Sequence, residues 1–279
     1  RDSVDAARRI ARLTRLVGRD GEARRFDQMA DESARAWQEE FLDTDHGKVG
    51  SGTQTAQTFA LGFGALPDSA VKPVFEHLVA DLTAPDDGPR LTTGIFGTQI
   101  LLEELSHHGR HDLAFALAER DTFPSWGWML KNDATTLWEH WAGSDDTFSH
   151  NHPMFGSISA WFFRWLGGIQ PAQDAVGGDR LLIRPQVVPG LEWVKCSHHS
   201  VRGPIESNWS TNGKEQTFEV VLPPNTRATI ELPAQPGDQL AEGGRPLAEV
   251  PDLEVLPSRP EAHRLKVGSG RYQFSLKRK

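Results

Sequence analysis

The spacing of apolar residues changes once along this chain, near the glycine pair Gly167-Gly168. Before the pair, apolar side chains recur every three or four residues, which is typical of amphipathic helices. After it, short runs such as residues 217–222 (TFEVVL) alternate apolar and polar side chains, which is typical of strands with one buried face. One uniform architecture cannot satisfy both patterns. We therefore expect a helical domain at residues 1–170 and a β-domain at residues 171–279.

The first domain predicts one helix after another, joined by short or moderate polar loops. Consecutive helices should then pack as antiparallel hairpins in a bundle, a solenoid or an α/α toroid. The lack of a fixed repeat of roughly 33 or 34 residues weakens the solenoid. The expected helices cover residues 3–17, 21–42, 53–64, 68–82, 93–106, 110–120 and 156–166.

The second domain is divided into short segments by turn-forming clusters such as Thr211-Asn212-Gly213. Short alternating segments separated by such turns predict an antiparallel β-sandwich of about seven or eight short strands. The clearest strand-like runs are residues 181–185, 191–195, 204–209, 217–222, 227–232 and 272–276.

Charge and cysteine content exclude several classes of function. The net charge of -8 leaves no dominant basic face for a nucleic acid. A single cysteine, Cys196, rules out an internal disulfide framework and a cysteine-built zinc site. The sequence has no run of 18 or more apolar residues, so we expect no membrane span.

The chain begins at Arg1, directly in an amphipathic pattern, without a methionine or a signal-like apolar region. We therefore expect a mature portion, a proteolytic piece or an incomplete chain. The compartment stays open. The lack of a visible signal peptide favours the cytoplasm, while a single cysteine fits either the cytoplasm or export.

Residues 124–157 gather four of the nine tryptophans and three of the eleven histidines. Glu139 lies among them in the run Trp138-Glu139-His140-Trp141. A tryptophan face can stack on the C–H face of a sugar ring, and a carboxylate that loses solvation among such rings suits proton transfer. The structural alternative is that the rings are core residues and that Glu139 is a solvated residue of a short helix.

Other catalytic motifs fit this chain less well. Its histidine pairs do not form the HExxH arrangement of a helical zinc site, so we expect no metal. The GxxxxGK[ST], strand-linked GxGxxG and GxSxG motifs are all absent. Helical hairpins, an aromatic cluster with carboxylates and a β-sandwich together favour carbohydrate chemistry, in which two carboxyl groups flank a glycosidic bond. Spacing does not decide which carboxylate acts, or on which sugar.

Four ordered blocks occur at residues 91–98 (LTTGIFGT), 124–128 (PSWGW), 134–141 (ATTLWEHW) and 149–157 (SHNHPMFGS). Together they resemble the bacterial α-L-rhamnosidases of glycoside hydrolase family 78, and the resemblance extends over essentially the whole chain. It implies that the helical domain is the later part of an (α/α)6 barrel. The remainder would be the C-terminal β-sandwich of the same family.

The resemblance implies inverting hydrolysis of terminal α-L-rhamnosides without an organic cofactor. Glu139 stands where the family places its general base, which activates the water that attacks the anomeric carbon. His152 matches a histidine that contacts the rhamnose near that water. Trp126 and Trp138 match residues that line the pocket.

Each assignment has a structural alternative. His152 could pack within its loop, and Trp126 could be a core residue; we expect Trp128 and Trp141 to be core residues. Asp133 and Asp145 could orient water or bind hydroxyl groups, although solvated loop acids are the simpler interpretation.

One family feature is missing from this chain. The general acid of the family lies in a block of the form Asp…Glu-Arg-x-Gly-Trp-x-Gly-Asp in the earlier half of the barrel, and no such block occurs here. We therefore expect the chain alone to be close to inactive and to have the missing N-terminal part of the enzyme as a partner. The missing helices should also leave an apolar face uncovered.

Two other functions stay open. A non-catalytic glycan-binding remnant or subunit would bind a rhamnose-containing glycoside or oligosaccharide without turnover. A different α/α-toroid glycosidase or lyase would act on another sugar.

Overall fold

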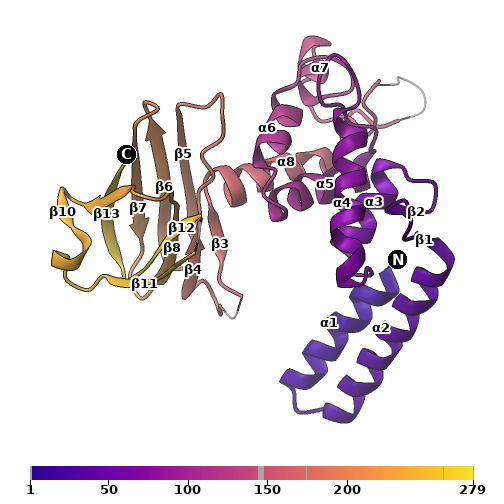
Figure 1. Ribbon diagram of the computed structural model, residues 1–279, viewed down its shortest axis with the longest axis horizontal. Helices are drawn as coiled ribbons and strands as arrows, with labels where there is room; N and C mark the ends of the chain where they lie inside the picture. The colour runs from indigo at the N-terminus through magenta and orange to yellow at the C-terminus, as the bar shows by residue number, and fades with distance from the viewer. Residues whose placement is uncertain (1, 144–147, 174, 260, 279) are drawn as a thin grey trace. The chain divides into compact units, whose positions relative to one another are not determined.

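Contacts divide the chain into two compact units (Figure 1). The first, Arg1–Ile158, is helical, and the second, Ser159–Lys279, is built mainly of strands. This order confirms the helical region followed by a β-domain. The boundary at residue 170 stays a prediction, because the last helical segment runs from one unit into the next. The computed structural model describes residues 2–143, 148–173, 175–259 and 261–278.

Six of the predicted helices appear within a residue or two of their expected ends. The seventh is broken into a 3-10 turn, a short α-helix and a π-helical turn, and the short α7 adds a helix where a loop is expected. No described helix is both long and apolar enough to cross a membrane. The helical elements are α1 (Asp2–Leu16), α2 (Asp20–Phe41), α3 (Gln54–Gly62), α4 (Asp68–Thr83), α5 (Ile95–His107), α6 (His111–Glu119), α7 (Trp126–Lys131), η1 (Pro153–Gly156), α8 (Ser157–Trp161) and η2 (Phe162–Leu166).

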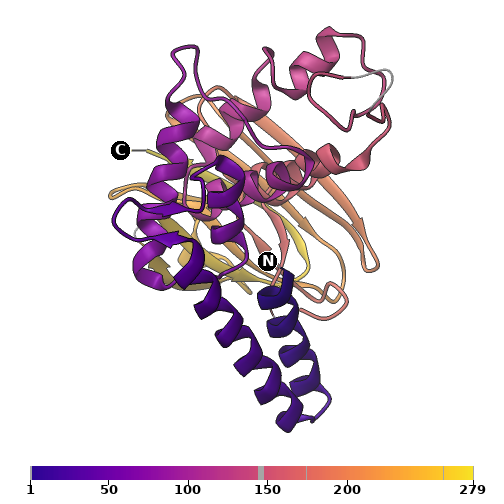
Figure 2. The same ribbon diagram turned by 90° about the vertical axis from the view of Figure 1, so that its right-hand side faces the viewer.

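Helices α1 and α2 form a hairpin, and the two helices lie side by side in both views (Figure 1 and Figure 2). Their interface is made by the small buried side chains of Val4, Ala7, Ala30 and Ala34. Small side chains let two helix backbones approach closely. Other apolar side chains of α1 stay exposed, as Leu13 at 61% exposure illustrates.

Helix α3 packs against α4 and α5, and its buried amide side chains hold the loops around it. Gln57 accepts a hydrogen bond from the Val49 backbone N–H (2.7 Å) and donates one to the Gly47 carbonyl oxygen (2.8 Å). Gln54 bonds in the same way to backbone groups of Arg90 (3.0 Å) and Thr92 (2.8 Å). Buried polar groups need such partners, so the two glutamines fix the loops before α3 and α5.

The loop after α4 is tied to the end of α6 by an ionic contact. The Asp87 carboxylate accepts hydrogen bonds from Arg90 (2.7 Å) and Arg120 (2.6 Å). These bonds lower the pKa of Asp87 below its ordinary value; the bond from Arg90 contributes most, and the bond from Arg120 comes next. This contact holds Arg120 in place just before the segment that leads to α7.

The described part of the second unit forms two sheets, with strand orders β10-β9-β13-β7-β6-β5 and β11-β12-β8-β4-β3. These eleven strands exceed the predicted seven or eight. Strands β4 and β8 run parallel, with Leu181 beside Ala228, so the expectation of a purely antiparallel sandwich is wrong at this pair. The strands are β3 (Ile169–Pro171), β4 (Arg180–Ile183), β5 (Trp193–Ser200), β6 (Gly203–Thr211), β7 (Glu215–Leu222), β8 (Arg227–Pro233), β9 (Gln239–Glu242), β10 (Arg245–Pro246), β11 (Glu254–Arg259), β12 (Ala262–Val267) and β13 (Gly270–Lys277). A two-stranded ribbon, β1 (Leu42–Asp43) with β2 (Lys48–Val49), lies in the helical unit.

The two sheets enclose one apolar core. Ile183 and Ile230 from the five-stranded sheet and Phe218 and Phe274 from the six-stranded sheet belong to the same buried cluster. Gly168 precedes the first strand with φ at +73°, and an added Cβ would lie 2.1 Å from the backbone nitrogen of Pro185. The change of architecture therefore begins at a position that only glycine can occupy.

Candidate active site

Helix α7 starts the candidate site and is capped by Ser125. The buried Ser125 hydroxyl accepts a hydrogen bond from the Trp128 backbone N–H (2.9 Å), as an N-cap residue does. Gly127 faces the end of α6, where an added Cβ would lie 2.6 Å from the Arg120 carbonyl oxygen. The serine and the glycine of the PSWGW block are thus explained by a cap and by a close backbone approach.

Three aromatic rings, those of Trp126, Trp141 and Phe155, pack together and form the aromatic base of the site. Trp126 meets Trp141 edge-on, with ring centroids 5.1 Å apart, and Trp141 stacks on Phe155 at 3.8 Å. The indole N–H of Trp126 donates to the Phe155 carbonyl oxygen (3.0 Å), and that of Trp141 donates to the Thr93 carbonyl oxygen (2.8 Å). Both indoles are buried with their N–H groups bonded, which is the behaviour of core tryptophans.

The segment that carries Glu139 is not a helix, so the short helix expected there is wrong. Residues 134–143 instead form turns and irregular chain, and part of this stretch pairs with residues 149–152. The Glu139 backbone N–H donates to the Ser149 carbonyl oxygen (2.8 Å), and the His152 N–H donates to the Leu137 carbonyl oxygen (2.9 Å). This pairing brings the WEHW and SHNH blocks side by side.

The Glu139 carboxylate is partly buried and held at one of its two oxygens. Its Oε2 atom accepts a hydrogen bond from the Ser149 backbone N–H (2.9 Å). Within the described part of the chain, its Oε1 atom has no hydrogen-bond donor. One oxygen therefore orients the group, and the other can accept a proton from a water or a substrate hydroxyl.

Two histidines follow on the paired segment. His150 stacks on Trp138, with ring centroids 5.4 Å apart and an interplanar angle of 28°. His152 accepts a hydrogen bond at Nδ1 from the Met154 backbone N–H (3.3 Å), so its neutral form carries the proton on Nε2. His152 can therefore present an N–H donor on the side of the ring away from the backbone.

A cavity of about 450 Å³ opens beside Trp138. Its polar lining includes Asn132, Asp133, Thr136 and His150. Asp133 has a left-handed backbone, with φ at +57°, where α7 ends and the Ala134 N–H donates to the Met129 carbonyl oxygen (3.0 Å). An indole surrounded by hydroxyl, amide and carboxylate groups suits a polyhydroxylated ligand.

The predicted site residues therefore separate into two groups. Trp138 lines the cavity, whereas Glu139, His152 and Trp126 are not among its lining residues. Glu139 and His152 lie on the paired segment next to it, and Trp126 lies in the aromatic base. Their roles stay predictions. Asp145 lies outside the described residues.

Sequence reasoning missed the parts of the cavity wall that come from Asn132, Thr136 and His150. The signal available was the polar run at residues 132–136, between two aromatic blocks. His150 stood out as part of the 149–157 block, but its place in the cavity wall depends on the pairing of two loop segments.

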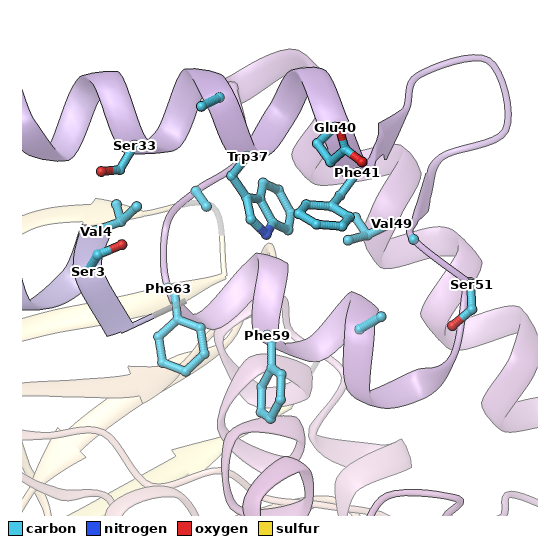
Figure 3. Close-up of a pocket in the computed structure, with 14 residues that line it drawn as sticks. Ser3, Val4, Ser33, Trp37, Glu40, Phe41, Val49, Ser51, Phe59 and Phe63 are labelled. Atoms are coloured by element: carbon cyan, nitrogen blue, oxygen red, sulfur yellow. The ribbon is translucent and has the colours of Figure 1, made fainter.

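A second cavity, of about 580 Å³, lies among α1, α2 and α3 (Figure 3). Trp37 and Phe41 from α2 and Phe59 and Phe63 from α3 line it, and Glu40 is its only charged residue. It offers apolar surface rather than paired acid–base groups, so it is not the candidate active site. Across the described residues, no three His, Cys, Asp or Glu side chains gather as a metal site requires.

Helical hairpins followed by a β-sandwich, with a carboxylate held beside tryptophans, define the class of helical-barrel glycosidases. Residues 3–166 match the family described as the bacterial alpha-L-rhamnosidase 6 hairpin glycosidase domain, and residues 168–245 match the bacterial alpha-L-rhamnosidase C-terminal domain. The chain belongs to this family, glycoside hydrolase family 78.

Individual relatives agree with the family match. An alpha-L-rhamnosidase of Alteromonas sp. (strain LOR) is 33% identical over 235 residues, which are 81% of this chain and 25% of the relative. The solved alpha-L-rhamnosidase of Dictyoglumus thermophilum has a TM-score of 0.88 at 27% identity, covering 98% of this chain and 31% of that one. That of Streptomyces avermitilis, complexed with L-rhamnose, has a TM-score of 0.87 at 27% identity, with coverage of 98% and 26%. The chain thus spans between a quarter and a third of the length of these relatives.

Proposed function

We propose that this chain supplies the general base and part of the sugar pocket of an inverting α-L-rhamnosidase. The observation that carries the proposal is the Glu139 carboxylate, held at one oxygen by the Ser149 N–H next to Trp138. In the reaction, Glu139 takes a proton from a water while that water attacks the anomeric carbon of a terminal rhamnose. Proton transfer of this kind contributes roughly 10²–10⁴-fold to the rate.

The cavity beside Trp138 supports a role in holding the sugar. Trp138 lines the cavity and offers apolar ring surface to the C–H face of the rhamnose, and His152 donates a hydrogen bond to a hydroxyl near the attacking water. Trp126 acts as pocket support, because it fixes Trp141 and Phe155 beneath the site. The solved relative from Streptomyces avermitilis, which is complexed with L-rhamnose, supports the choice of sugar.

The general acid must come from residues outside this chain. Inversion needs two carboxyl groups about 6.5–9.5 Å apart, so that a water fits on one face of the sugar and the leaving group is protonated on the other. The sequence contains no acidic block of the family type. We therefore propose that the 279-residue chain binds rhamnosides and turns them over only with the rest of the barrel.

A second candidate is a glycan-binding subunit that never performs catalysis. The missing acidic block favours it, since a base without an acid can still bind the sugar. This candidate predicts binding without turnover under every condition.

One comparison separates the two candidates. An aryl α-L-rhamnoside is assayed with the 279-residue chain alone and with the longest polypeptide that its gene encodes. We expect turnover only in the second case. Saturable binding without turnover in both samples would favour the glycan-binding subunit instead.

A further inference from the structure

An exposed tryptophan lies on the β-sandwich, in a different unit from Glu139. Trp193 begins β5, the edge strand of the six-stranded sheet, and 61% of its surface is exposed. Tryptophan is highly buried on average, so an indole this open is uncommon. The Lys195 ammonium nitrogen lies 5.8 Å from the centroid of the Trp193 ring.

The strand register places polar side chains on the same face as this ring. Across β5 and β6, Trp193 pairs with Ser210 and Lys195 pairs with Asn208. Across β6 and β7, Ser210 pairs with Thr217 and Asn208 pairs with Glu219. Side chains that pair across strands point to one face of a sheet, so these six residues form a continuous surface.

This surface is hollowed. The same six residues border a shallow cavity of about 170 Å³. The Asn208 side-chain oxygen accepts the Cys196 backbone N–H (3.0 Å), which orients its amide group and leaves the two amide N–H donors for a ligand. Glu219 offers acceptors, and the hydroxyl groups of Ser210 and Thr217 offer both donors and acceptors.

The charges of the surface narrow the class of ligand. Lys195 and Glu219 contribute one positive and one negative charge to the cavity wall, so neither an anion nor a cation is favoured. A flat ring beside alternating donors and acceptors matches a ligand with one apolar face and several hydroxyl groups. Neutral pyranose sugars have this chemistry.

We propose that the outer face of β5, β6 and β7 is a non-catalytic binding site for a neutral sugar residue. Trp193 stacks on the C–H face of the sugar, and Lys195, Asn208 and Glu219 bond its hydroxyl groups. The site goes beyond the proposed hydrolysis, because it needs neither Glu139 nor a general acid. It would hold a glycan to the β-sandwich independently of the helical unit.

The test titrates the 279-residue chain with methyl α-L-rhamnoside, methyl β-D-glucoside, methyl β-D-galactoside and methyl α-D-galacturonide by ligand-observed NMR. We expect at least one neutral glycoside to bind. Trp193→Ala should weaken this binding roughly tenfold, which corresponds to about 1.4 kcal/mol, and Trp193→Tyr should retain most of it. Glu219→Ala should also weaken binding, through the loss of an acceptor.

Trp138→Ala is the control for sugar bound at the candidate active site. Binding at the sheet should survive this variant, whereas rhamnoside bound beside Glu139 should not. Thermal unfolding and circular dichroism confirm that each variant is folded. The proposal is overturned if Trp193→Ala binds like the wild type, if only Trp138→Ala loses binding, if the galacturonide binds best, or if no neutral probe binds.

Discussion

Gln57 has no exposed surface, yet its amide group carries three backbone contacts. It accepts from Val49, donates to Gly47 at 2.8 Å and makes a longer contact with the Val74 carbonyl oxygen at 3.4 Å. These bonds fasten the ribbon between α2 and α3 onto the helical core. A buried glutamine was not expected on this helix, because a sequence pattern shows polarity and not the loops that a polar group will meet.

Gln57→Leu should lower the free energy of unfolding by about 2–3 kcal/mol, because it leaves the Val49 N–H and the Gly47 carbonyl buried without partners. Urea unfolding followed by tryptophan fluorescence measures the change. Gln28→Leu is the matched control, since Gln28 is exposed on α2 and should change stability by less than about 0.5 kcal/mol. Equal stability of the two variants would show that the Gln57 bonds are not needed.

The candidate site shows how far single residues could be predicted. Glu139 and Trp138 stood out from the sequence because a carboxylate between two tryptophans is unusual in local composition. The contacts of Glu139 with Ser149 and of Trp138 with His150 could not be predicted in the same way. They depend on backbone pairing between two loops, which leaves no periodic pattern.

Regular elements followed their local patterns, and irregular ones did not. The six long helices were predictable from apolar spacing over several turns. The segment around Glu139 was not, because a backbone bond from Glu139 to Ser149 pairs it with another loop segment in place of a helix. Five strands, β3, β9, β10, β11 and β12, lie outside the predicted runs. Of these, β9 and β10 are short and lie in a stretch rich in glycine and proline, which hides a strand pattern.

Gly168→Ala should destabilise the β-sandwich by more than about 4 kcal/mol. The added Cβ would lie 2.1 Å from Pro185 N and 2.3 Å from the Arg184 carbonyl carbon, so backbone just before β3 or just after β4 would have to move. Gly177→Ala is the control, because Gly177 has φ at +57° with no atom within 4 Å of the added Cβ. Gly177→Ala should lower the free energy of unfolding by only about 1–2 kcal/mol, which is the cost of a left-handed backbone for a residue with a Cβ. Denaturant unfolding of the two variants measures the difference, and equal losses would contradict the steric argument.

At the scale of the whole molecule, the division into helices and strands was visible in the change of periodicity, whereas the extent of the helical unit was not. The chain spans about a quarter of the curated relatives named above. An exposed apolar ridge runs along α1 through Ile10 and Leu13 to Val17, just past the end of the helix, with Leu13 61% and Val17 70% exposed. We expect further helices to cover this ridge in a longer barrel, and we expect the ridge to promote self-association of the chain alone.

The 279-residue chain should therefore self-associate as its concentration rises. Replacing both Leu13 and Val17 by glutamate should shift it towards monomer, because two charges interrupt the ridge without touching the interface of α1 with α2. Sedimentation velocity over a range of concentrations measures this. Val201→Glu is the control, since Val201 is 91% exposed and isolated on a turn of the β-sandwich. A wild-type chain that stays monomeric at every concentration would contradict the expectation.

If Glu139 is the base of a rhamnoside hydrolase, removing its carboxylate slows turnover without unfolding the protein. Glu139→Gln is introduced into the longest polypeptide that the gene encodes, and kcat is measured on an aryl α-L-rhamnoside. Glu103→Gln, which changes another partly buried glutamate of the helical unit, serves as the control. We predict that Glu139→Gln lowers kcat by roughly 10²–10⁴-fold with an unchanged circular dichroism spectrum, while Glu103→Gln has little effect. Turnover by Glu139→Gln close to that of the wild type would contradict the assignment of Glu139 as the general base.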